Sequence, residues 1–164
     1  MVTRNGKQKI MNLAEILRPD AVKAVSSVGS KKRLFQELGE ISFAAHGLTQ
    51  GAVCSALQER ETLGPTGVGS GIALPHARMD TVDRVLGVFV RLEKPIDFDA
   101  VDRQPVDLIF TLLAPEDAGV DHLKALALVS RTMRNSDLCA KLRANSDPST
   151  LHTLLTEAPT SQAA

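Results

Sequence analysis

The sequence predicts a single domain of the α/β or α+β class, in which one sheet is covered by helices on both faces. The chain has 164 residues, 43% of them hydrophobic, which suffices for one buried core without a disulfide or a metal. Short runs of apolar, β-branched residues fill its middle, and patterns with a helical period lie before and after them. Because these helices must bury their apolar faces, we expect them to pack on both faces of the central sheet.

Two helices are expected before the strands. The first begins after Ser30, a potential N-cap, and stops at Gly47. Its apolar side chains share a helical spacing, and they are Leu34, Leu38, Ile41 and Ala45. The second helix runs from about Thr49 to Glu61, shortly before a Gly-Pro pair, and carries Val53, Ala56 and Leu57 on one side.

The middle of the chain contains three segments that predict strands. They span residues 72–74, 86–90 and 106–113, and each is a short apolar run bounded by Gly, Pro or Asp. Residues 21–25 form an earlier candidate that is too short for its pattern to separate strand from helix. The sheet is therefore expected to form mainly from the second third of the sequence.

Helical patterns return after Pro115. Asp121 is available as a cap and His122 falls in the first turn of this helix. Its expected apolar side consists of Leu123, Leu126, Val129 and Met133. Two shorter helices are expected after it, one carrying Leu138 and Leu142 and one, behind an Asp147-Pro148 cap, carrying Leu151, Leu154 and Leu155.

Charge and composition disfavour several classes of partner. Nineteen basic residues balance nineteen acidic ones, so no overall field attracts nucleic acid or an anionic membrane. Cys54 and Cys139 lack a CxxC pair or a histidine at ligand spacing, and we interpret both as buried, inert thiols. No secretory signal or long apolar run occurs, which predicts a cytoplasmic domain over residues 10–156, no membrane insertion, and flexible ends at residues 1–9 and 157–164.

A run of glycines precedes a histidine in the central segment. Residues 64–76 read GPTGVGSGIALPH, a pattern that predicts a short apolar strand ending at Pro75-His76. Glycine allows successive backbone amides to turn inward and bind an anion, so we expect a phosphate loop formed by the backbone of Gly67, Gly69, Ser70 and Gly71. A dinucleotide-binding loop would follow a strand and open a helix, and a P-loop would continue with Lys-Ser or Lys-Thr, so nucleotide binding is disfavoured.

His76 has the properties of a nucleophile. Pro75 fixes the backbone angle before it, and a neutral imidazole can attack phosphorus. A phosphohistidine requires hydrogen-bond donors on its oxygens, which His122 and Arg60 could supply from helix ends. The alternative for His76 is a hydrogen-bonded structural residue, and for Arg60 a favourable charge at a helix C-terminus.

Three segments carry a resemblance to a known family. They read GPTGVGSGIALPHAR, VLGVFVRLEKPIDFDAVDRQPVDLIFTLLAP and DHLKALALVSRTM. They resemble the IIA domain of the fructose/mannitol class (EIIA type 2) of the bacterial phosphotransferase system, and most of all its stand-alone nitrogen-regulatory branch. The resemblance implies a mixed sheet of about five strands, His76 as phosphoryl acceptor, and His122 and Arg60 as the residues that assist it.

The resemblance also implies partners. The donor would be a small phosphocarrier of the HPr type, charged from phosphoenolpyruvate by an enzyme I. The phosphorylation state would then regulate partner proteins such as transporters, kinases or transcriptional regulators. We expect no cofactor and no metal, because transfer between two histidines depends on positioning and charge stabilisation.

Two alternatives remain open at this point. The chain could be the IIA component of a sugar uptake system and pass the phosphoryl group to a IIB domain. It could also be a non-catalytic protein-binding module, although the presence of His76, Arg60 and His122 argues against loss of transfer. We favour a regulatory phosphocarrier over a metabolic enzyme component because no transporter domain is fused in this sequence.

Overall fold

The computed structural model describes residues 11–157 of the chain. The helices are α1 (Leu13–Ile16), α2 (Lys31–His46), α3 (Gln50–Glu61), α4 (Val120–Met133), α5 (Ser136–Arg143) and α6 (Pro148–Thr156), with a short 3₁₀ helix η1 (Pro19–Ala21). The strands are β1 (Val22–Val25), β2 (Gly67–Gly69), β3 (Ile72–Ala73), β4 (His76–Met79), β5 (Leu86–Ile96) and β6 (Val106–Pro115). The expected flexible ends, apart from Glu157, lie outside the described residues.

The strands form one mixed sheet around β6. The order is β1-β5-β6-β3-β2, and β4 also pairs with β6, on the same side as β3. β5 and β6 are antiparallel, whereas β3 and β4 run parallel to β6 and β1 runs parallel to β5. The predicted mixed sheet is confirmed, with six strands within residues 11–157 in place of about five.

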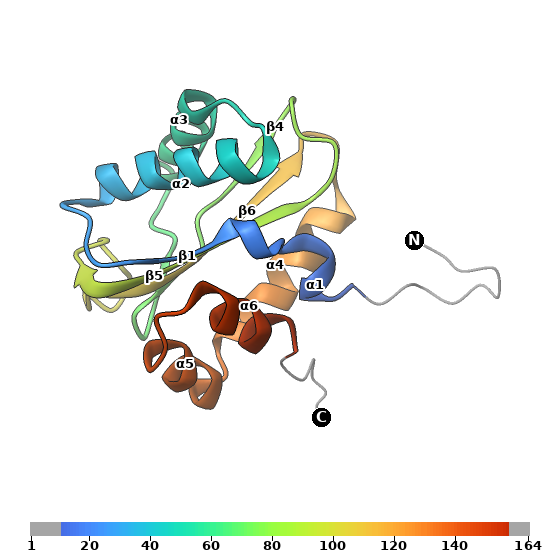
Figure 1. Ribbon diagram of the computed structural model, residues 1–164. Helices are drawn as coiled ribbons and strands as arrows, with labels where there is room; N and C mark the ends of the chain where they lie inside the picture. Colours follow the sequence, from blue (N-terminus) through green and yellow to red (C-terminus); the bar gives the residue numbers. More distant parts are fainter. Residues whose placement is uncertain (1–10, 158–164) are drawn as a thin grey trace.

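Helices cover both faces of this sheet, as predicted. Figure 1 shows α2 and α3 on one side and α4, α5 and α6 on the other. The core between them is mainly aliphatic, and its largest fully buried side chains include Phe89, Phe98 and Phe110. β6 is buried along nearly its whole length because it has strand neighbours on both edges and helices on both faces.

Local signals place α2 and α6 where the sequence predicts them. The Ser30 hydroxyl accepts a hydrogen bond from the Arg33 amide at 3.1 Å, and α2 ends at Gly47 with φ of 73°, a left-handed conformation that glycine adopts without strain. Asp147 caps α6 by accepting from the Thr150 amide at 3.0 Å. These ends are determined by short-range chemistry, which explains why the sequence reveals them.

The prediction for α4 is wrong in two details. Its N-cap residue is Gly119, and no side chain caps it, so Asp121 lies in the first turn and is not the cap. The buried face includes His122, which is 6% exposed, whereas Leu123 is 63% exposed. The predicted side is right at Val129 and Met133, which are buried, and wrong at Leu123, because a histidine, which a hydropathy pattern counts as polar, takes the buried position in the first turn.

The strand before His76 also differs from the prediction. β3 ends at Ala73, and His76 opens β4, a strand that the sequence analysis did not separate from β3. Leu74 and Pro75 lie between the two strands, and the Pro75 carbonyl accepts from the Leu112 amide at 3.0 Å. Pro75 therefore interrupts the strand because it has no amide hydrogen to donate.

The two cysteines differ in exposure. Cys139 is buried, its thiol donates to the Met133 carbonyl, and burial raises the pKa of that thiol. Cys54 is only partly buried, so the expectation that both thiols are buried is met for Cys139 alone.

Helices α2 and α3 pack closely at Gly39. A Cβ atom at Gly39 would lie 2.6 Å from the Gln50 carbonyl oxygen, a backbone atom at the start of α3. Replacing a helical glycine by alanine usually stabilises by about 0.5–1 kcal/mol. For Gly39→Ala we expect the opposite sign, a loss of about 1–3 kcal/mol in the free energy of unfolding, because the two helices must separate.

The measurement is urea denaturation, with Gly51→Ala as the matched control. A Cβ atom at Gly51, in the first turn of α3, meets nothing within 4 Å, so this variant should be neutral or slightly more stable. A Gly39→Ala variant as stable as the wild type would contradict the close contact.

Candidate functional site

One cavity of about 640 Å³ brings the three predicted site side chains together. Arg60 comes from the last turn of α3, His76 from the first residue of β4, and His122 from the first turn of α4. Arg78, also on β4, lines the same cavity. Residues that are far apart in the sequence therefore meet where β4 passes between α3 and α4.

The hydrogen bond of His76 determines which nitrogen is free to react. Its Nδ1 lies 2.9 Å from the Leu74 carbonyl oxygen. A carbonyl oxygen can only accept, so Nδ1 carries the proton and Nε2 keeps its lone pair. Burial lowers the pKa of His76, and the nearby positive charge of Arg60 lowers it further, against the effect of the Leu74 bond. His76 is thus a neutral imidazole at pH 7, which is the nucleophilic form.

His122 presents the opposite arrangement. Its Nδ1 accepts a hydrogen bond from Arg78 Nε at 3.1 Å, so Nε2 carries the proton. This Nε2 is buried and has no hydrogen-bond partner within the described part of the chain. The centroids of the His76 and His122 rings are 5.6 Å apart. A buried donor without a partner next to a nucleophile is suited to bind an oxygen of a transferred group.

Two guanidinium groups supply hydrogen-bond donors to the cavity, whose rim also includes the acidic residues Glu59, Asp80 and Glu116. Arg60 Nη1 donates to the Gly64 carbonyl at 3.0 Å, which leaves other N–H groups of that side chain for a ligand. Arg78 holds the His122 ring and also donates to the Glu116 carbonyl at 3.5 Å. An anion with several oxygens, such as a phosphoryl group, matches these donors.

Arg78 is the site residue that the sequence analysis missed. It lies two positions after His76, and side chains at i and i+2 of a strand point to the same face. That spacing was the available signal, but it required knowing that His76 begins a strand.

The glycine-rich segment lies away from this cavity. Gly67, Gly69, Ser70 and Gly71 belong to the β2–β3 hairpin, where Ser70 has φ of 59° and its amide donates to Asp102 at 2.9 Å. The Gly71 carbonyl accepts from Asp107, whereas His76 pairs with Leu112 on the same strand. Five residues of β6 separate these positions, roughly 16 Å along the strand. The structure does not bring these four residues to His76, and their glycines form a tight turn.

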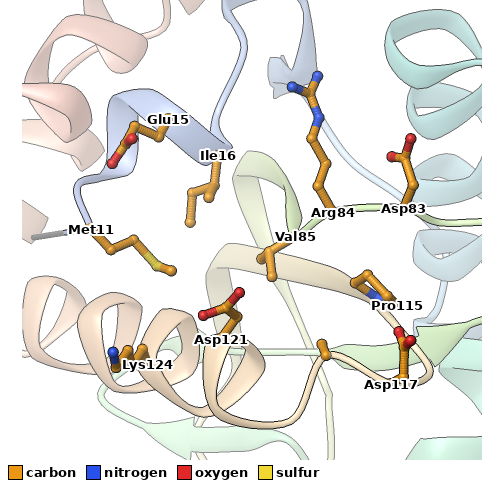
Figure 2. Close-up of a pocket in the computed structure, with 11 residues that line it drawn as sticks. Met11, Glu15, Ile16, Asp83, Arg84, Val85, Pro115, Asp117, Asp121 and Lys124 are labelled. Carbon is orange, nitrogen blue, oxygen red and sulfur yellow. The ribbon is translucent and has the colours of Figure 1, made fainter. Parts of the chain in front are cut away.

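A second pocket lies on the other side of the loop between β6 and α4. Figure 2 shows Asp121 directed into it, with Lys124 of the same helix and Asp117 of the loop at its edge. This pocket contains none of the predicted site residues. It explains why Asp121, adjacent to His122 in sequence, does not take part in the histidine site.

The described residues were also searched for a metal site and for a helix that could span a membrane. Within residues 11–157, no three His, Cys, Asp or Glu side chains come together in a way that could hold a metal ion. Among the same residues no helix is both long and apolar enough to cross a membrane.

The buried histidines predict a pH dependence of stability. Burial lowers the pKa of His46, His76 and His122 below the ordinary value of 6.5. Below pH 6.5 the unfolded chain therefore binds more protons than the folded one, and the free energy of unfolding should decrease as the pH falls from 7.5 to 5.5. Urea denaturation at both pH values measures this.

An NMR titration of the histidine ring protons then assigns the effect. The midpoint for His76 is expected below 6.5, and a midpoint above that value would contradict its burial as a neutral ring.

Comparison with known proteins finds relatives that match most of the chain. A family model described as "Phosphoenolpyruvate-dependent sugar phosphotransferase system, EIIA 2" matches residues 15–158. A nitrogen regulatory protein of Bradyrhizobium diazoefficiens is 42% identical over 153 residues, which cover 93% of this chain and 100% of that protein. A nitrogen regulatory protein of Escherichia coli is 38% identical over 149 residues, or 90% of this chain and 91% of that protein.

Solved structures show the same relationship. The crystal structure of nitrogen regulatory protein IIA-Ntr from Neisseria meningitidis matches with a TM-score of 0.80 at 37% identity, covering 88% of this chain and 99% of that one. IIA mannitol from Escherichia coli matches in fold, with a TM-score of 0.71 at 18% identity, over 84% of this chain and 97% of that one. The chain therefore belongs to the EIIA type 2 family of the phosphoenolpyruvate-dependent sugar phosphotransferase system.

Proposed function

We propose that this chain is a cytoplasmic regulatory phosphocarrier that accepts a phosphoryl group on His76 Nε2 from an HPr-type protein. The proposal rests on one observation: two histidine rings in the same cavity are protonated at opposite nitrogens. His76 presents an unprotonated Nε2, and His122 presents a protonated Nε2 without a partner in the described chain. The first is a nucleophile, and the second is a donor for the group that the nucleophile receives.

The transfer follows from these positions. The lone pair of His76 Nε2 attacks the phosphorus of the donor's phosphohistidine, a new P–N bond forms, and the P–N bond to the donor breaks. The donor nitrogen recovers its lone pair, and the PO₃ group moves without a change in the number of protons. The proton of His76 stays on Nδ1, where its hydrogen bond to the Leu74 carbonyl fixes the ring during the reaction.

Arg60 and His122 would stabilise the transferred group. Both residues line the cavity beside His76, and their N–H groups would donate to the phosphoryl oxygens in partly buried surroundings, where such contacts are stronger than in water. This step uses protein side chains alone and requires no cofactor or metal in the proposed scheme.

Regulation would follow from the added charge. Leu63, which lines the cavity, is 82% exposed, and Val120 and Leu123 on either side of His122 are also exposed. Exposed apolar side chains of this size beside a reactive group mark a surface for protein partners. A phosphoryl group on His76 places close to two negative charges beside that surface, so a partner can distinguish the two forms.

The relatives support a regulatory role over a role in sugar uptake. Two relatives that align over more than nine tenths of their length carry the name nitrogen regulatory protein. We therefore propose that the phosphorylation state controls a transporter, a kinase or a transcriptional regulator.

Intact-mass measurement tests this proposal. The chain is incubated with phosphoenolpyruvate, enzyme I and an HPr-type protein, and one added phosphoryl group that is lost in acid is expected. Rapid loss of that group to a IIB domain would favour the sugar-uptake alternative. No addition in the presence of a demonstrably phosphorylated donor would favour a non-catalytic binding module.

A further inference from the structure

A third cavity, separate from the histidine site and from the pocket of Figure 2, lies between the β2–β3 hairpin and helices α4 and α5 and is partly open to solvent. Its volume is about 480 Å³, within the range of small-molecule sites. Its apolar lining comes from Val68, Ile72, Leu74, Met133 and Cys139.

The polar groups around this cavity leave one cation available. Arg143, at the end of α5, binds both carboxylate oxygens of Asp107 and also donates to the Ser70 carbonyl at 2.8 Å, so its charge is compensated. Arg134, at the junction of α4 and α5, donates its backbone amide to the Ser130 carbonyl, but its guanidinium has no hydrogen-bond or ion-pair partner within residues 11–157. Ser130 and Ser136 line the same cavity and add hydroxyl groups to this rim.

We propose that this cavity binds a small amphipathic organic anion, whose apolar part occupies the space between the hairpin and the helices and whose acidic group contacts Arg134. The apolar lining matches an apolar ligand body, and the one guanidinium of this lining without an ion-pair partner in the described chain, that of Arg134, matches a negatively charged group on the ligand. A single available cation does not match the series of phosphates along a nucleic acid.

Leu74 connects this cavity to the histidine site. Leu74 lines the cavity, and its carbonyl oxygen accepts a hydrogen bond from His76 Nδ1 at 2.9 Å. Helix α4 forms another connection, because Ser130 and Met133 line the cavity and His122 lies in the first turn of the same helix. A bound anion therefore contacts both segments that carry the histidines, and we infer that it changes the rate at which His76 accepts a phosphoryl group. This second step rests on the proposed function.

Binding is tested with 8-anilino-1-naphthalenesulfonate, an aromatic sulfonate whose fluorescence increases in apolar surroundings. Saturable binding of one molecule to the full chain is expected. Arg134→Gln should weaken binding by about fivefold because it removes the charged contact. Arg131→Gln, a cation of the last turn of α4 that does not line the cavity, is the matched control and should leave binding unchanged.

Two experiments show whether the probe binds in this cavity: a substitution that fills the cavity, and an NMR titration. Ser130→Phe should reduce binding by more than tenfold by occupying the cavity, provided that its melting curve matches that of the wild type. Methyl NMR signals of Ile72 and Leu74 should shift on titration. Equal binding by wild type and Arg134→Gln, or shifts confined to the pocket of Figure 2, would overturn the proposal.

The connection to His76 is measured as the initial rate of phosphorylation with saturating probe. A change of at least twofold in the wild type, reduced in Arg134→Gln at the same probe concentration, is expected. An unchanged rate while the probe is bound would overturn the connection. Absence of any phosphorylation would count against the proposed function, and the fluorescence titration would still decide whether the cavity binds an anion.

Discussion

Replacing His76 by alanine is expected to abolish phosphoryl transfer completely. The variant removes the nitrogen that forms the P–N bond, and no other side chain that lines the cavity is an imidazole with a free ring nitrogen. Arg60 and Arg78 are cations that carry no free lone pair, and the Nδ1 lone pair of His122 is used by Arg78.

The measurement is intact mass over time with the phosphorylated HPr-type donor. His152→Gln is the matched control, because the His152 ring contacts the Leu17 carbonyl at 2.9 Å and does not line the cavity. This control should gain one phosphoryl group at the wild-type rate. His76→Ala loses one hydrogen bond, so its free energy of unfolding should fall by only about 1 kcal/mol. A phosphorylated His76→Ala chain would show that the acceptor had been assigned to the wrong residue.

Replacing His122 by alanine is expected to slow transfer by about 10²–10³-fold, the usual cost of removing one preorganised donor. The final mass should be the same as in the wild type, because the nucleophile remains. Removal of His122 also leaves Arg78 Nε without its acceptor, so part of the loss arises from a guanidinium that is no longer held.

Single-turnover rates distinguish this role from a structural one. His122→Gln retains an amide N–H donor and should recover part of the rate that His122→Ala loses. If His122 were needed only for packing, restoring an N–H donor would not restore the rate. Asp121→Asn, on the same helical turn but lining the pocket of Figure 2, should change the rate by less than about twofold, since it is outside the cavity. An unchanged rate in His122→Ala would contradict the proposed role.

The sequence predicts those parts of the fold that depend on neighbouring residues. The ends of α2 and α6 follow from Ser30, Gly47 and Asp147, whose interactions lie within three or four positions. β4 could not be separated from β3 because its four residues pair only with β6, more than thirty positions away. The first turn of α4 was misjudged for a related reason, since burial of His122 depends on β4 and on Arg78.

The candidate site could also be predicted only in part from the sequence. His76, His122 and Arg60 were predicted, and the structure places all three in one cavity. The glycines were expected there too, because a glycine run can form an anion-binding nest or a tight hairpin, and sequence alone does not distinguish these uses. Positive φ angles at Gly69, Ser70 and Gly71, together with the Ser70–Asp102 bond, show the hairpin.

The position of β4 in the sheet implies uneven protection of backbone amides from exchange with solvent. β6 has strand neighbours on both edges, so its amides should exchange with deuterium only when the whole domain unfolds. β4 pairs with β6 alone, and its amides can exchange through local opening of an edge strand. The acceptor histidine thus lies on a segment able to adjust to an incoming group while the rest of the sheet keeps its shape.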